Sequence, residues 1–174
     1  AEAEPNAATA ESRAPAIERN AIDHALDPAL PAMSVLLLDD GTARGDVGDL
    51  SVLPFPLSVA VDASLPDAEE AITYYRGLGA EVIAIVPLPD GATPTDVDVT
   101  FQAYGPLLEN VVAVMIPEEA GFQALGPAAV QIAVNLKERG LGLVSFPEGL
   151  NTGHKSAVKE TVAAGLVFRD LDGE

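Results

Sequence analysis

Two adjacent carboxylates, Asp39 and Asp40, are the feature of the sequence with the clearest chemical potential. They end the stretch VLLLDD, and such a continuous aliphatic run is typical of a strand that is buried on both faces. Carboxylates at the end of a buried strand are costly to desolvate without partners. A pair of them can work as acid and base, hold a cation, or cap the following turn. We predict a catalytic role for Asp39 and Asp40 and keep loop capping as the alternative.

Further carboxylates follow the other apolar runs of the chain. Because the carboxyl ends of parallel strands meet at one edge of a sheet, these side chains are predicted to form an acidic mouth. Asp40, Glu118 and Glu119 are the candidate ligands of a divalent cation, the only cofactor that we consider. In a chain with 27 acidic residues, a rim of solvated acids is the alternative. The remaining candidates are predicted to line the mouth around a ligand: Asp62, Asp90 and Glu148.

Several common chemistries lack their motifs. The chain has no cysteine, which excludes disulfides, thiolate nucleophiles and zinc ribbons. It has two histidines, His24 and His154, and no G-x-S-x-G stretch for a serine hydrolase. The glycines after Asp40 do not follow the G-x-G-x-x-G spacing, and no G-K-[ST] follows a glycine-rich loop.

The charge excludes some partners. With 9 basic and 27 acidic residues, the formal net charge is 9 − 27 = −18, which disfavours nucleic acid and anionic membrane surfaces. Residues 1–32 contribute two bases and six acids, or −4, so −14 belongs to the rest. No apolar run reaches the roughly 18 residues that a membrane-spanning helix needs.

The elements that would position these residues alternate between strands and helices. Short runs rich in Val, Ile and Leu indicate strands, and apolar spacings of three and four indicate helices. This pattern predicts a parallel sheet, either open and doubly wound or closed as a barrel. Ser64 and Asp67 are predicted to form a capping box before the first helix. The strands are expected at 33–38, 57–61, 82–87, 111–116, 141–146 and 166–168, and the helices at 65–78, 96–108, 122–139 and 154–164.

Residues 1–32 differ from the rest of the chain. They contain eleven alanines and four prolines and have little apolar periodicity. We predict an extended linker or strap here, with plain disorder as the alternative, and one folded domain over residues 33–174.

From Met33 onward the chain resembles the divergent polysaccharide deacetylases. The stretches that carry the likeness are VLLLDDG at 35–41, FPLSVAVDASLPDAEEAITYYRGLGAEVIAI at 55–85, VVAVMIPEEAGFQ at 111–123, LKERGLGLVSFPEGLN at 136–151 and VFRDLDGE at 167–174. The resemblance implies a (β/α) barrel with fewer than eight strands and a periplasmic or exported location. It also implies a metal-dependent deacetylase of acetylated sugars, in which a metal-activated water attacks the acetyl carbonyl.

The sequence departs from that family at its metal ligands. Asp39 and Asp40 match the family's acid pair, but the expected histidine before Pro87 is absent, as is the Asn-His-x-Gly-Ser type motif, whose position reads MIPEEAG at 115–121. We therefore predict a catalytically degenerate, deacetylase-like domain that binds a glycan such as peptidoglycan or acts as a scaffold. One alternative is an active deacetylase with an all-carboxylate Mg²⁺ or Ca²⁺ site. Another is a receiver-like phosphoacceptor domain built on Asp39, Asp40, Asp90 and Lys155.

Members of that family usually continue beyond the equivalent of the LDGE at 171–174. An unclosed barrel would leave a sheet edge exposed. We accordingly expect a protein partner or a missing C-terminal segment at this edge.

Overall fold

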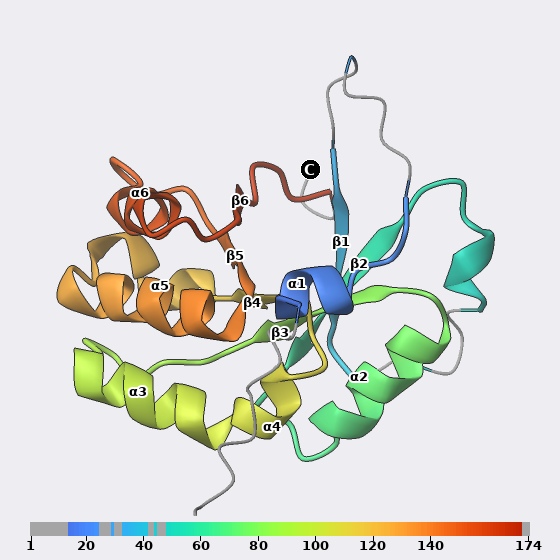
Figure 1. Ribbon diagram of the computed structural model, residues 1–174, viewed down its shortest axis with the longest axis horizontal. Helices are drawn as coiled ribbons and strands as arrows, with labels where there is room; N and C mark the ends of the chain where they lie inside the picture. Colours follow the sequence, from blue (N-terminus) through green and yellow to red (C-terminus); the bar gives the residue numbers. More distant parts are fainter. Residues whose placement is uncertain (1–13, 25–28, 30–32, 42–43, 45–47, 172–174) are drawn as a thin grey trace, which may run out of the picture.

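The computed structural model describes residues 14–24, 29, 33–41, 44 and 48–171. In this part of the chain, six parallel strands form one sheet in the order β1-β2-β3-β4-β5-β6. The sheet curls into a half-barrel that is flanked by helices (Figure 1). The strands are β1 (Val35–Asp39), β2 (Leu57–Asp62), β3 (Glu81–Ile85), β4 (Ala113–Met115), β5 (Gly142–Ser145) and β6 (Ala164–Leu166).

The strand order decides between the two predicted architectures. Each strand pairs with the next one along the chain, so the order never reverses. Right-handed crossovers that all step in the same direction place their helices on one face of the sheet and curl it toward a barrel. The predicted α/β fold with fewer than eight parallel strands is confirmed, and the open, doubly wound alternative is wrong. The receiver-like alternative is wrong for the same reason, because the strand order of that fold is 2-1-3-4-5, with the second strand at the edge of the sheet.

The helices differ from their predicted limits mainly at glycine–proline pairs. The helix predicted over 96–108 is interrupted where Gly105 and Pro106 begin a new one, and the helix predicted over 122–139 restarts at Pro127, after Gly126 with its φ of 55°. The α-helices are α1 (Ala16–Arg19), α2 (Ala68–Gly77), α3 (Pro94–Ala103), α4 (Gly105–Leu108), α5 (Pro127–Arg139) and α6 (Thr152–Lys159). The described residues also contain the 3₁₀ helices η2 (Leu50–Val52), η3 (Glu118–Ala120) and η4 (Phe122–Ala124).

The predicted capping box of Ser64 and Asp67 is wrong. Both the backbone N and the Oγ of Ser64 donate to Asp62 Oδ1, at 2.8 and 2.7 Å, so Ser64 closes a turn behind β2. Asp67 precedes α2 without capping it, because its carboxylate accepts from Arg44. A capping box does occur at α3, where Thr93 and Asp96 exchange hydrogen bonds.

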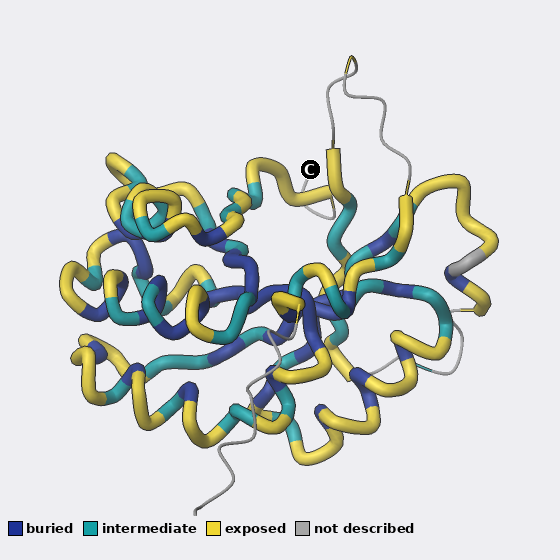
Figure 2. The backbone as a smooth tube through the Cα atoms, viewed as in Figure 1, coloured by how far each residue is buried: buried dark blue, intermediate teal, exposed yellow. Residues whose placement is uncertain are grey.

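Apolar side chains form one cluster on each face of the sheet. The larger, outer cluster lies between the sheet and the helices and includes the fully buried Phe101, Ile132 and Leu136. The smaller cluster lies on the concave face and contains Ala60, Ile83, Val112, Ala113 and Met115. The middle strands are accordingly the most deeply buried part of the molecule (Figure 2).

Residues 14–24 form a strap across the amino ends of the strands. The backbone N of Ile17 donates to Gly140 O at 2.8 Å, and the amide of Asn20 donates to Glu109 O and Val111 O at 3.0 and 2.9 Å. The backbone N of Ile22 donates to Glu81 Oε1 at 3.0 Å. This part of the predicted linker therefore packs on the body of the domain, while residues 1–13 lie outside the described residues.

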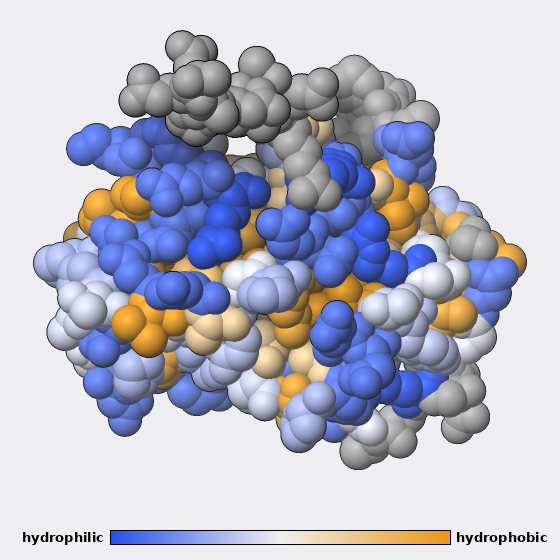
Figure 3. Space-filling model, turned by 60° about the horizontal axis from the view of Figure 1, so that its bottom comes forward, coloured by the Kyte–Doolittle hydropathy of each residue, from blue (hydrophilic) through white to orange (hydrophobic). Residues whose placement is uncertain are grey.

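The surface agrees with the predicted absence of a membrane span. None of the helices among the described residues combines the length and apolarity needed to cross a bilayer. The face shown in Figure 3 is mainly hydrophilic, with scattered hydrophobic patches.

The contact between α3 and α5 can be tested by titrating Asp98. Its Oδ1 accepts hydrogen bonds from Asn135 and Gln131 of α5, each at 2.8 Å, and these bonds lower the pKa of Asp98 below the ordinary value of 3.8. A depressed pKa stabilises the fold above the unfolded-state pKa, and this contribution is lost as the pH falls through the folded-state pKa. We expect Asn135→Ala to raise the pKa of Asp98 in an NMR titration of side-chain carboxyl carbons.

Asp96 provides the internal control for that titration. Its pKa is also lowered, but by the side chain and backbone of Thr93. It should titrate unchanged in the Asn135→Ala variant. An unchanged Asp98 would contradict the interpretation.

Candidate functional site

The two neighbouring carboxylates of the predicted pair are directed to opposite faces of β1. Val35 packs against the outer cluster and Leu36 against the concave cluster, so alternation places Asp39 toward the helices. Asp40 follows directly after the strand, in step with the residues of the concave side. The pair is therefore split between two environments.

Asp39 is held by protein donors on the helix side. Its side chain is 3% exposed, its Oδ1 accepts from Gly41 N at 2.8 Å, and its Oδ2 accepts from Arg44 Nε at 2.6 Å. Arg44 also pairs with Asp67, just before α2, and its backbone carbonyl accepts from the hydroxyl of Tyr74. These contacts form a clamp between β1 and α2, which we call the Asp39 clamp.

The Asp39 clamp changes the electrostatics of its neighbours. The pKa of Tyr75 is raised, first by burial and then by the charge of Asp39. The pKa of Arg44 is raised, chiefly by its hydrogen bond to Asp39. Both oxygens of Asp39 have protein donors, so these contacts favour a structural role over the predicted catalytic one, which stays untested.

Asp40 and Asp62 belong to neighbouring chain segments at the mouth. The β1–β2 register pairs Leu38 with Ala60 and ends with Asp39 opposite Val61, so Asp40 and Asp62 are the residues that follow this last pair. Asp40 lies just outside the strand and is exposed. Asp62 is half-buried and shares the concave side of β2 with Ala60 of the inner cluster. On the same face, the partly buried Ile85 of β3 is the register partner of Asp62, and Phe146, after β5, packs on the same inner cluster.

The other predicted mouth residues are exposed and spread along the rim. Asp90 follows β3 beyond two prolines, Glu118 and Glu119 begin η3, and Glu148 follows Pro147 after β5. No group of three or more His, Cys, Asp or Glu side chains in the described part of the chain could hold a metal ion. The structure thus does not gather Asp40, Glu118 and Glu119 into such a group, and a cation site there stays a prediction.

Neither histidine lies next to the Asp40–Asp62 pair. His24 is exposed and ends the strap, near the amino ends of the strands. His154 lies in the first turn of α6, where its backbone N donates to Gln123 Oε1 at 3.0 Å. Gln123 in turn donates to Phe146 O at 2.8 Å. Sequence reasoning missed this bridging glutamine, whose only signal is a polar residue between apolar neighbours.

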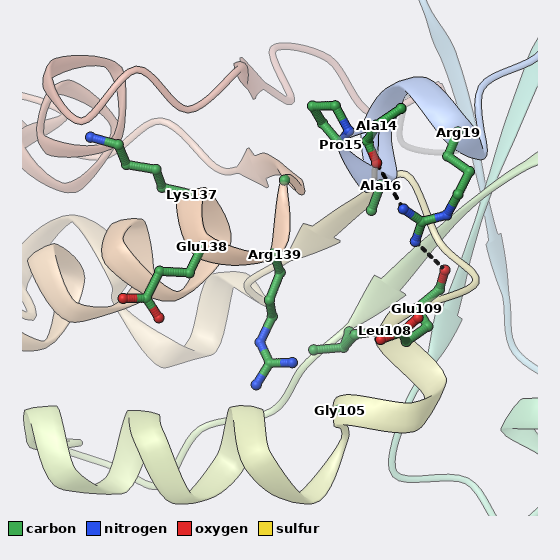
Figure 4. Close-up of a pocket in the computed structure, with 11 residues that line it drawn as sticks. Ala14, Pro15, Ala16, Arg19, Gly105, Leu108, Glu109, Lys137, Glu138 and Arg139 are labelled. Atoms are coloured by element: carbon green, nitrogen blue, oxygen red, sulfur yellow. Dashed lines mark hydrogen bonds between the residues drawn. The ribbon is translucent and has the colours of Figure 1, made fainter. Parts of the chain in front are cut away.

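A cavity of about 370 Å³ lies at the opposite, amino end of the sheet, between the strap, α4 and the end of α5 (Figure 4). Arg19, Lys137 and Arg139 line it together with Glu109 and Glu138. Arg19 donates to Ala14 O and Glu109 O at 2.9 and 3.2 Å, and Arg139 donates to Phe101 O at 3.0 Å. Cations at helix carboxyl ends neutralise exposed carbonyls, so Arg19 and Arg139 serve the packing of the strap and helices. Lys137 pairs instead with Glu160, at 3.6 Å.

The comparisons with known proteins support the fold alone. No protein-family model matches the chain, and the search of curated proteins found no match either. Among solved structures, the chain is similar to an uncharacterized protein from Agrobacterium tumefaciens, with a TM-score of 0.68 and 16% sequence identity. The match covers 92% of this chain and 72% of that one. At this identity the likeness establishes a shared architecture and assigns no activity.

Proposed function

We propose that the domain is a catalytically degenerate, deacetylase-like module that binds a glycan of the cell envelope at the carboxyl-end mouth of its half-barrel. The observation that carries this proposal is the placement of Asp40 and Asp62 on neighbouring strand ends, beside an apolar concave face. Binding sites for small organic ligands combine apolar surface with a few placed polar groups. Carboxylate oxygens accept hydrogen bonds from sugar hydroxyls, and apolar side chains pack on the C–H faces of a sugar ring.

The positions of the two histidines and of Asp39 favour glycan binding over hydrolysis. A metal-dependent deacetylase needs an ion that activates water, and zinc sites of this kind usually include imidazole ligands. His24 lies at the far end of the sheet, and His154 lies in the first turn of α6, after β5, which is three strands away from β2. Asp39, one of the two acids that match the family's pair, already has protein donors on both oxygens.

Glycan titrations test the proposal. We expect chito-oligosaccharides or peptidoglycan fragments to raise the thermal unfolding temperature and to give a measurable dissociation constant by calorimetry. Asp40→Ala and Asp62→Asn should each weaken binding about tenfold, a change of about 1.4 kcal/mol. Glu70→Gln, an exposed change on α2, is the matched control and should bind as the wild type does. The absence of any shift at millimolar sugar would contradict glycan binding.

The carboxylate pair also favours one alternative, an active deacetylase with a hard cation. Two adjacent carboxylates are a partial ligand set for Mg²⁺ or Ca²⁺. Acetate release from acetylated sugars, measured with a panel of divalent metals, separates the two functions. Metal-dependent release that is lost in Asp40→Ala would establish the enzyme, whereas equal background release from both proteins would leave the binding module.

A further inference from the structure

The first strand of the sheet has the composition of an interior strand but lies at an edge. Its residues 35–38 are Val-Leu-Leu-Leu, a run typical of strands covered on both sides. In the described part of the chain, β1 pairs only with β2. Leu37 and Leu38 alternate between the two faces, and they are 43% and 64% exposed. Figure 2 shows β1 as exposed or intermediate, in contrast to the buried middle strands.

Apolar side chains next to β1 extend this exposed surface. Met33 precedes β1 by two residues, and Phe55 precedes β2, the neighbouring strand, by two. They are 74% and 47% exposed. We use the name β1 edge for the unpaired side of β1 together with the exposed apolar side chains beside it on both faces, which are those of Met33, Leu37, Leu38 and Phe55.

The other edge of the sheet is not comparable. β6 has three residues, and the middle one is Gly165. A short edge strand with a central glycine is a poor template for pairing, whereas a longer aliphatic edge recruits further strands. Among the described residues, the sheet is therefore open to strand addition on the β1 side.

We propose that the β1 edge binds an extended, basic segment of a partner protein by strand addition. The charge of this region selects the partner. Residues 33–62 contain one base and five acids, so their net charge is 1 − 5 = −4, within a chain of −18. Arg44, the single base, already pairs with Asp39 and Asp67. A strand with aliphatic residues at alternate positions and Lys or Arg between them would hydrogen-bond to the backbone of β1, pack on the exposed apolar side chains and complement the negative charge.

The charge also argues against a second copy as the occupant. Two copies would bring two regions of −4 together in chains of −18, which costs Coulomb energy at moderate ionic strength. A strand added next to β1 would also border the mouth, because Leu38 and Asp40 follow one another on the concave side. The proposed partner would thus add side chains to the rim of the glycan site without depending on that site.

Fluorescently labelled peptides of the pattern Lys-Val-Lys-Val-Thr-Val-Lys-Val-Lys, in several permutations of the aliphatic residues, are the probes. We expect at least one to bind with a dissociation constant below about 1 mM by anisotropy, more weakly as salt rises, and to shift the NMR amide signals of residues 35–38. The same peptides with Glu in place of Lys should not bind.

Two variants of exposed residues make the test specific. Leu38→Lys should weaken peptide binding about tenfold, because it removes apolar contact and repels the basic strand. Val99→Lys on α3 is the matched control, since Val99 is 61% exposed and lies away from β1. Met33→Lys, at a site 74% exposed, is a second variant that should weaken binding if Leu38→Lys proves poorly folded.

Three outcomes would overturn the proposal. They are failure of every basic peptide to bind, equal binding of the basic and acidic peptides, and a concentration-dependent dimer in sedimentation that Leu38→Lys dissociates. The third outcome would assign the β1 edge to a second copy of the chain. None of these outcomes bears on glycan binding, which is measured with different ligands and variants.

Discussion

Asp39→Ala is expected to lower the free energy of unfolding by about 2–4 kcal/mol, the range for removing one partner of a buried ion pair that keeps a second contact. The change removes a carboxylate that is 3% exposed and leaves Arg44, 19% exposed, with Asp67 as its remaining acidic partner. It also removes the acceptor of the Gly41 amide. Urea denaturation followed by circular dichroism measures the loss.

Asp67→Ala is the matched control, because it removes the other carboxylate of the same Arg44. Asp67 is 53% exposed, and an exposed ion pair contributes at most about 1 kcal/mol. A second measurement follows the phenol of Tyr75 by ultraviolet titration, with Tyr75→Phe to identify its signal. Loss of the Asp39 charge should lower the pKa of Tyr75 while burial still keeps it above the ordinary value.

Equal stability of Asp39→Ala and the wild type would overturn the Asp39 clamp. It would return Asp39 to the group of candidate catalytic residues, since catalytic groups often contribute little to stability or even reduce it.

Gly140→Ala is expected to lower the free energy of unfolding by about 2–5 kcal/mol. Gly140 has a φ of 67°, and a left-handed conformation costs other residues about 1–2 kcal/mol. An added Cβ would also lie 2.7 Å from the Cα and Cβ of Pro15 and 2.9 Å from the N of Ala16. Overpacking of this kind typically costs about 1–3 kcal/mol more, here by displacing the strap.

Gly121→Ala separates the two contributions. Gly121 has a φ of 56°, and a Cβ at this position would meet no atom within 4 Å. It should therefore show the conformational cost alone. Hydrogen exchange of the Ile17 amide, which donates to Gly140 O, should become faster in Gly140→Ala and stay unchanged in Gly121→Ala. Equal losses of stability in the two variants would show that the strap does not pack tightly on Gly140.

The sequence predicted the strands better than their arrangement. Aliphatic runs ending in proline or acid located all six strands, with β6 displaced toward the N-terminus by two residues. The sequence could not distinguish a barrel-like sheet from a doubly wound one, because both are built from the same alternation of strands and helices. Strand order is set by how each crossover packs, which depends on contacts between helices such as α3 and α5.

The candidate site was predicted in outline and not in detail. Carboxylates do follow the strand ends, but an all-aliphatic strand gives no alternation that would show which of Asp39 and Asp40 points to the concave face. The partner of Asp39 is Arg44, five residues away, and no local sequence pattern predicts this ion pair. The strap was harder still, because its contacts are with residues 81, 109, 111 and 140.

Those distant contacts of the strap also determine when it can form. The hydrogen bond between Ile17 and Gly140 closes a gap of 140 − 17 = 123 residues. During synthesis at about 5–20 residues per second, the strap leaves the ribosome roughly 6–25 s before its binding surface exists. The strand repeats can assemble stepwise from neighbour to neighbour in the meantime. Docking of the strap is then a late step in the biogenesis of the domain, although the strap itself is made before every strand of the sheet.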